Sequence, residues 1–147
     1  MTSKPTIPPI NVLLVEDNQD DIDLTKEAFS EACIHLNLYT SRDGVQALEF
    51  LNNPNNPKPD LILLDLNMPR KDGRETLAEI KAHPLLKRIP VIILTTSEAE
   101  KDIVSAYEKN ANSYIVKPVS FDQFLDVVKA LEEFWFTIVK LPTNDMS

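Results

Sequence analysis

Acidic side chains directly follow two apolar runs of strand length. Glu16 and Asp17 come after residues 12–15, and Asp65 comes after residues 61–64. Carboxylates gathered at one place repel one another unless they share a cation or a proton. Their oxygens suit Mg²⁺ or Mn²⁺, whereas zinc would call for Cys or His ligands that this pattern does not offer. The sequence therefore predicts a divalent metal site made by Glu16, Asp17 and Asp65.

Phosphoryl transfer is the reaction that such a site favours, because Mg²⁺ commonly keeps several waters and binds a substrate phosphate. A carboxylate is a sufficient nucleophile, since this reaction mainly requires in-line placement and charge neutralisation. We expect Asp65 to be the nucleophile because it ends the most apolar run. Lys117 and Thr95, with Thr96 beside it, are the candidates to bind phosphoryl oxygens. The bond between Lys117 and Pro118 is a candidate cis peptide, although trans is the general default.

Each of these residues also has a plain structural interpretation. A carboxylate after a strand can cap a helix, Thr95 can be an ordinary strand residue, and Lys117 can be a solvated surface charge. Caps do not readily explain why carboxylates, a hydroxyl and a lysine should all follow strands at one edge of a sheet. The combination favours the functional interpretation.

The elements that must position these residues alternate along the chain. Strands are predicted at 12–15, 36–40 (an alternating, edge-like pattern), 61–64, 91–94 and 114–116. Helices are predicted at 21–32, 45–51 after an Asp43-Gly44 cap, 75–82, 99–109 and 121 to about 139. This alternation predicts an α/β protein with a parallel sheet covered by helices on both faces. Ligands of such sheets bind beyond the carboxyl ends of the strands.

One domain with a substantial core is what 147 residues with 43% hydrophobic content predict. We expect a flexible N-terminal tail over residues 1–9, a folded domain over residues 10–133 and an aromatic C-terminal extension over residues 134–147. No separate output module is expected.

Composition argues against several functional classes. With only Gly44 and Gly73, the chain has neither a dinucleotide fingerprint nor a P-loop. A net charge of -8 would repel nucleic acid, which is therefore not an expected partner. No apolar run reaches the roughly 18 residues of a membrane helix, and no signal peptide is recognisable. The chain is expected to be cytoplasmic and to have no membrane partner.

The C-terminal extension carries more apolar residues than one helix face can use. A helical stripe continues to Trp135, and Phe134, Phe136, Ile138 and Val139 then cover the other sides. An exposed apolar patch of this kind usually marks an interface. The expected interface residues, for a homodimer or another partner, are Phe134, Trp135, Phe136 and Ile138. The alternative is that the extension folds back on its own domain.

These motifs resemble the receiver domains of response regulators over about residues 10–133. The matching segments are Leu-Val-Glu16-Asp17-Asn18, Leu-Leu-Asp65-Leu-Asn67-Met-Pro69, Ile-Leu-Thr95-Thr-Ser and Lys117-Pro118. The resemblance implies the flavodoxin-like, chemotaxis-regulator type of doubly wound five-stranded parallel sheet, in the order 2-1-3-4-5, with five helices. It also implies a histidine kinase that phosphorylates Asp65.

The resemblance assigns further roles. Glu16 and Asp17 would position the metal, and Asn67 would contribute a backbone carbonyl to it. Tyr114 would be an aromatic switch residue that couples with Thr95, although Tyr114 can also be a half-buried strand aromatic.

The chain is also similar to the single-domain regulators that partner bacterial and cyanobacterial phytochromes. The segments that carry this similarity are Val-Glu16-Asp-Asn18, Leu-Asn67-Met-Pro-Arg-Lys-Asp-Gly73-Arg, Leu-Thr95-Thr-Ser97 and Glu-Glu133-Phe-Trp-Phe136. It implies a light-regulated histidine kinase as phosphodonor and a dimer. We expect the output to be a surface change on the face formed by the fourth helix, the fifth strand and the fifth helix, acting on an unknown downstream protein.

Two other functions are weighed against this one. Phosphatases with an aspartyl nucleophile usually carry a second acid two residues later, where this chain has Asn67. Without that general acid we expect no enzyme, only slow self-dephosphorylation. A docking scaffold with an unused site is the third interpretation, and the complete set of acceptor residues argues against it.

Overall fold

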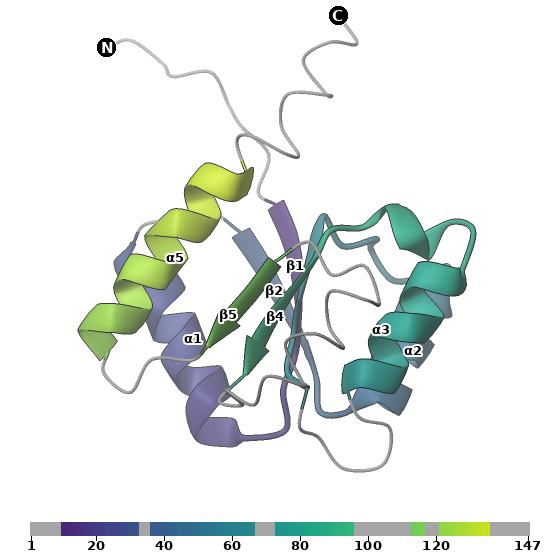
Figure 1. Ribbon diagram of the computed structural model, residues 1–147, viewed down its shortest axis with the longest axis horizontal. Helices are drawn as coiled ribbons and strands as arrows, with labels where there is room; N and C mark the ends of the chain where they lie inside the picture. Colours follow the sequence, from purple (N-terminus) through teal and green to yellow (C-terminus); the bar gives the residue numbers. More distant parts are fainter. Residues whose placement is uncertain (1–9, 33–35, 67–72, 96–112, 117–120, 136–147) are drawn as a thin grey trace, which may run out of the picture.

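The computed structural model describes residues 10–32, 36–66, 73–95, 113–116 and 121–135 (Figure 1). One sheet of five parallel strands runs through the middle of these residues, in the order β2-β1-β3-β4-β5. The strands are β1 (Ile10–Val15), β2 (Leu36–Ser41), β3 (Leu61–Leu64), β4 (Val91–Thr95) and β5 (Ser113–Val116). All five strands were predicted, and the order implied by the family resemblance is confirmed.

The register brings the ends of the strands to one edge of the sheet. Val15 is aligned with Ser41 of β2 and with Leu64 of β3. On the other side of β3, Leu64 is aligned with Ile93, two residues before the end of β4. Residues that follow these strands therefore emerge at the same carboxyl edge.

Helices cover both faces of the sheet, as expected for parallel strands. They are α1 (Gln19–Glu31), α2 (Gly44–Asn52), α3 (Gly73–Ala82) and α5 (Phe121–Trp135), with a 3-10 turn η1 (Leu86–Arg88) that was not predicted. Figure 1 shows α1 and α5 on one face and α2 and α3 on the other. The helix predicted at 99–109, and any continuation of α5 beyond Trp135, lie outside the described residues. No helix in the described part of the chain is both long and apolar enough to cross a lipid bilayer.

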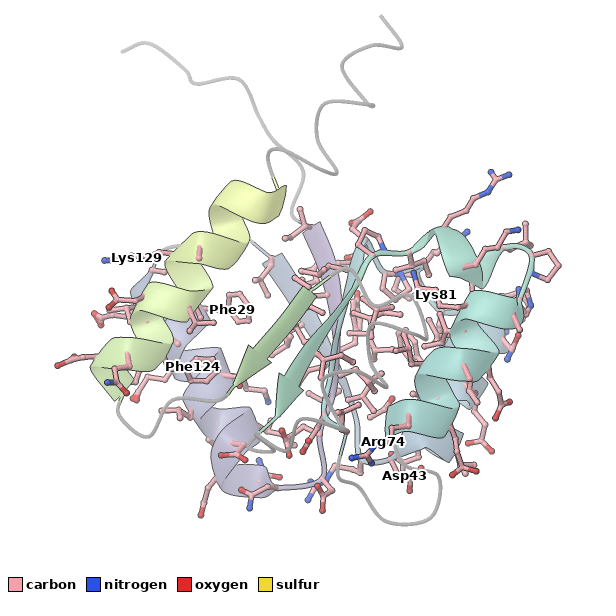
Figure 2. All side chains as sticks on the ribbon, viewed as in Figure 1. Phe29, Asp43, Arg74, Lys81, Phe124 and Lys129 are labelled. Atoms are coloured by element: carbon pink, nitrogen blue, oxygen red, sulfur yellow. The ribbon has the colours of Figure 1, made fainter. Side chains whose placement is uncertain are left out.

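The core consists of two layers, one on each face of the sheet. Alternate residues of the central strands point to opposite faces, so Leu13 and Ile62 pack on the side of α2 and α3. Leu63 packs on the other side with Phe29 of α1 and Phe124 of α5, both of which lie against the sheet (Figure 2). Because both faces are covered, the central strand β3 is apolar and buried throughout, whereas the edge strand β2 is only partly buried.

Two helices begin at side-chain caps that fix the loops above the carboxyl edge. Asn18 Oδ1 accepts a hydrogen bond from the Asp21 N–H at 3.0 Å and caps α1. Asp43 Oδ1 accepts from the Gln46 N–H at 2.9 Å and caps α2, which confirms the predicted cap. Each cap satisfies a backbone donor that the first turn of a helix leaves unpaired.

Lys81 of α3 joins this helix to the segment that leads into β4. Its ammonium donates to the carbonyl oxygens of Lys87 at 3.2 Å and Ile89 at 3.1 Å. Replacing Lys81 with Met is expected to lower the free energy of unfolding at neutral pH by about 1 kcal/mol, because both hydrogen bonds are lost. Urea unfolding of the two proteins measures this difference.

The same substitution should change how stability depends on pH. Burial lowers the pKa of Lys81 below its ordinary value of 10.5. Between the folded and unfolded pKa values the unfolded chain binds more protons at Lys81, so this residue makes stability rise as pH rises through that window. Urea unfolding repeated up to pH 10.5 should show this rise in the wild type and a smaller one in Lys81→Met. If the free energy of unfolding changed with pH identically in the two proteins, Lys81 would not be the cause of the rise.

Candidate functional site

Three carboxylates meet at the carboxyl edge of the sheet. Glu16 and Asp17 follow β1, and Asp65 follows the neighbouring strand β3. One carboxylate oxygen from each of the three residues lies within 4.8 Å of the others. The predicted acidic residues therefore converge at one place, although Asp65 comes 48 positions after Asp17 in the sequence.

The backbone that carries two of these residues is held by the sheet. The Glu16 N–H donates to the Ser41 carbonyl oxygen of β2 at 2.9 Å, and the Asp65 N–H donates to the Val15 carbonyl oxygen at 3.1 Å. The Glu16 side chain also accepts from the Asn18 N–H at 3.3 Å. These bonds continue the strand pairing by one residue and fix where Glu16 and Asp65 emerge.

The three carboxylates differ in burial, so the site is open to solvent on one side. Glu16 is 2% exposed and Asp65 is 7% exposed, whereas Asp17 is half-buried. Carboxylates with so little water contact are costly unless a cation or hydrogen-bond donors compensate their charge. Asp17 therefore lies on the side from which a solvated ion would enter.

The geometry fits a small divalent cation. Oxygens that share one Mg²⁺ at about 2.1 Å stand no more than about 4.2 Å apart. The observed oxygens, all within 4.8 Å of one another, need only a small side-chain rotation to reach that spacing. The donors are all hard carboxylate oxygens, which suit Mg²⁺ or Mn²⁺ better than softer metals.

Gly73, the first residue of α3, lies against the backbone of Asp65. A Cβ at this position would stand 2.1 Å from the Asp65 carbonyl oxygen and 2.6 Å from the Cα of Leu66. The Gly73 N–H donates to the Leu66 carbonyl oxygen at 2.9 Å. Only glycine fits here without moving the backbone of Asp65, a role that the sequence analysis did not identify.

Arg42 is a second residue that the sequence analysis missed. It follows β2, and its guanidinium donates to the Asp17 carbonyl oxygen at 2.9 Å and to Gln19 Oε1 at 2.8 Å. No local motif signals this contact, because Arg42 and Asp17 are 25 residues apart.

The other predicted residues are distributed as follows. Thr95 ends β4, and Tyr114 lies on β5 in register with Ile93. Asp43 and Arg74, which were not among the predicted site residues, also lie at this carboxyl edge (Figure 2). Phe134 and Trp135 are the last two residues of α5. The candidates outside the described residues are Asn67, Thr96, Lys117, Pro118, Phe136 and Ile138.

Comparison with known proteins identifies response regulators as relatives of this chain. A family model described as the response regulator receiver domain matches residues 12–129. The chain is 46% identical to the response regulator Rcp1 of Synechocystis sp., over 92% of this chain and 95% of that protein.

Solved structures agree with the sequence comparison. The phosphorylated cyanobacterial phytochrome response regulator RcpA matches with a TM-score of 0.81 and 47% identity, over 87% of this chain and 94% of the other. The Mn²⁺-bound form of Rcp1 matches with a TM-score of 0.79 and 46% identity, over 86% and 94% of the two chains. The response regulator RPA3017, from red light signalling in R. palustris, has a TM-score of 0.79 and 34% identity, over 88% and 94%.

Proposed function

This chain belongs to the response regulator receiver domains, and from that premise we propose that Asp65 accepts a phosphoryl group while Glu16, Asp17 and Asp65 hold a divalent metal ion. The observation that carries the proposal is the convergence of three carboxylates at the carboxyl edge of the sheet, with oxygens within 4.8 Å of one another. We further propose that Mg²⁺ is the working ion and that Mn²⁺ can replace it.

The chemistry asks little of the protein beyond placement and charge. A carboxylate oxygen of Asp65 attacks the phosphorus of the donor, a new O–P bond forms, and the bond from phosphorus to the donor breaks, with its electron pair leaving on the donor. A divalent cation, when bound, neutralises phosphoryl oxygens and lowers the barrier. The sheet holds Asp65 through its N–H to the Val15 carbonyl oxygen, so the nucleophile is placed before the donor arrives.

The remaining residues of the site have proposed roles that rest on sequence position. Lys117 and Thr95, with Thr96, bind the transferred phosphoryl group, and the backbone carbonyl of Asn67 completes the metal ligands. Tyr114 and Thr95 form the switch that changes the surface after phosphorylation. The position of Thr95 and Tyr114 on adjacent strands, β4 and β5, supports the proposed switch.

A receiver domain has a histidine kinase as its partner, and we propose that the kinase of this chain is a phytochrome-type light sensor. Support comes from relatives: RcpA is a cyanobacterial phytochrome response regulator, and RPA3017 acts in red light signalling. The aromatic residues around Phe134 and Trp135 are the proposed contact of a homodimer or of the downstream protein. Hydrolysis of the acyl phosphate is slow, because position 67 is Asn and provides no general acid.

Metal dependence tests the proposal directly. Intact-protein mass should increase by one phosphoryl group when the protein is incubated with acetyl phosphate and Mg²⁺. In excess EDTA the labelling rate should fall by about a hundredfold or more, because three carboxylates and a phosphoryl dianion would then repel one another. Restoring Mg²⁺ or Mn²⁺ should restore labelling. Equal labelling with and without metal would overturn the proposed metal site.

A further inference from the structure

Beyond the carboxylates themselves, the structure contains a side chain that ties down the loop carrying one of them. We propose that Arg42 is a positioning residue that holds Asp17 in place and thereby raises the affinity of the carboxylate cluster for a divalent cation. The inference rests on the proposed metal site, since it concerns how that site is held.

The two arms of the Arg42 guanidinium contact the loop that follows β1 and the first residue of α1. Nη2 donates to the backbone carbonyl oxygen of Asp17 at 2.9 Å, and Nη1 donates to Gln19 Oε1 at 2.8 Å. A planar guanidinium fixes the directions of its N–H groups, so two acceptors held at once restrain the loop in orientation as well as in distance. Asp17 lies within this restrained segment.

Arg42 is itself fixed at its backbone. Its N–H donates to Gln46 Oε1 at 2.9 Å, and the Gln46 N–H donates to the Asp43 cap of α2 at 2.9 Å. At the other end of the tether, Gln19 Nε2 donates to Asp23 Oδ1 on α1 at 2.9 Å. Arg42 thus connects the first turns of α1 and α2, the first through its guanidinium and the second through its backbone N–H.

Asp17 depends on such a tether more than the other two carboxylates do. The backbone N–H groups of Glu16 and Asp65 are bonded to neighbouring strands, and both side chains are buried. Asp17 is one residue further from β1 and half-buried, and the contact to its carbonyl oxygen comes from Arg42. Loosening this contact would let the Asp17 peptide rotate and would spread the three carboxylates over more arrangements. A ligand set that is not preformed binds its ion less tightly.

Charge alone predicts the opposite effect of removing Arg42, and this makes the inference testable. A guanidinium beside a cation site repels the cation, so deleting its charge should tighten metal binding on electrostatic grounds. Deleting a contact that positions Asp17 should instead weaken metal binding. The sign of the change in metal affinity therefore separates the two roles.

The experiment measures Mn²⁺ affinity, by electron paramagnetic resonance of free Mn²⁺, for the full chain and four variants. Arg42→Ala should bind Mn²⁺ about tenfold more weakly than the wild type. The Mn²⁺ affinity of Arg42→Lys should lie between those of Arg42→Ala and the wild type, because one ammonium lacks the planar fork of the guanidinium. Gln19→Ala should bind Mn²⁺ more weakly than the wild type but more tightly than Arg42→Ala, because it removes one of the two guanidinium contacts. Arg88→Ala is the matched control, because it removes the same charge from an exposed residue of η1, at the opposite edge of the sheet.

Thermal unfolding without metal accompanies the binding measurement. The positioning role would be supported if Arg42→Ala bound Mn²⁺ more weakly while Arg88→Ala bound it like the wild type. The thermal unfolding midpoints of all variants should then lie close together. Unchanged or tighter binding in Arg42→Ala would overturn it while leaving the metal site intact. A wild type that binds no Mn²⁺ would instead overturn the proposed function on which the inference rests.

Discussion

Replacing Asp65 with asparagine is expected to abolish the phosphoryl adduct formed with acetyl phosphate and Mg²⁺. The amide keeps the shape of the side chain but removes its negative charge, and a neutral amide oxygen is a very poor nucleophile towards phosphorus. The substitution also removes one of the three carboxylates that form the proposed metal site. The labelling rate should fall by about three orders of magnitude or more. Intact-protein mass spectrometry measures it.

Asp60→Asn provides the matched control for this prediction. Asp60 directly precedes β3, whereas Asp65 directly follows it, so the same substitution is made at opposite ends of one strand. The Asp60 carboxylate accepts from the Asn11 N–H at 2.9 Å and takes no part in the carboxylate cluster. Asp60→Asn should therefore keep the adduct. Full labelling of folded Asp65→Asn, with circular dichroism like the wild type, would place the acceptor on another residue.

Gly73→Ala is expected to damage both stability and phosphorylation. The new Cβ would lie 2.1 Å from the Asp65 carbonyl oxygen, and backbone atoms cannot move aside as cheaply as the end of a side chain. We expect the free energy of unfolding to fall by about 2 to 4 kcal/mol. A shift of Asp65 away from its in-line position should also slow labelling by about a hundredfold. Urea unfolding and intact-protein mass measure the two effects.

The direction of the stability change makes this prediction sharp. Glycine to alanine within a helix normally stabilises a protein by up to about 1 kcal/mol, so a loss at Gly73 would identify the close contact as its cause. Ala78→Ser, at an exposed position of the same helix, is the control and should leave labelling unchanged. If Gly73→Ala were as stable and as readily labelled as the wild type, the contact with Asp65 would not constrain the site.

Much of the fold was predictable from local patterns in the sequence. Continuous apolar runs such as residues 61–64 require cover on both faces, which a parallel sheet between two helical layers provides. The start of α2 at Asp43-Gly44 was predictable because a capping side chain and the backbone N–H that donates to it are only three residues apart in the sequence. The 3-10 turn at Leu86–Arg88 was not predicted, since so short a segment has no periodicity to detect.

The sequence by itself determined which residue types stand at the ends of the strands. Glu16, Asp17 and Asp65 each follow an apolar run, and strand ends in a parallel sheet share one edge, so their approach to one another followed from topology. Motif spacing also carried the family resemblance, which the comparison with known proteins confirmed.

Only the tertiary structure decided which long-range contacts hold the carboxylates in place and join α3 to the segment before β4. The Arg42 contact with Asp17, the fit of Gly73 against Asp65 and the bonds of Lys81 to Lys87 and Ile89 join residues with no shared local pattern. Such contacts depend on the angles at which separate elements pack and on distances of a few tenths of an ångström. Hydrophobic periodicity specifies which face of an element is buried, but it does not specify where a long polar side chain ends, and that depends on neighbours that folding alone brings close.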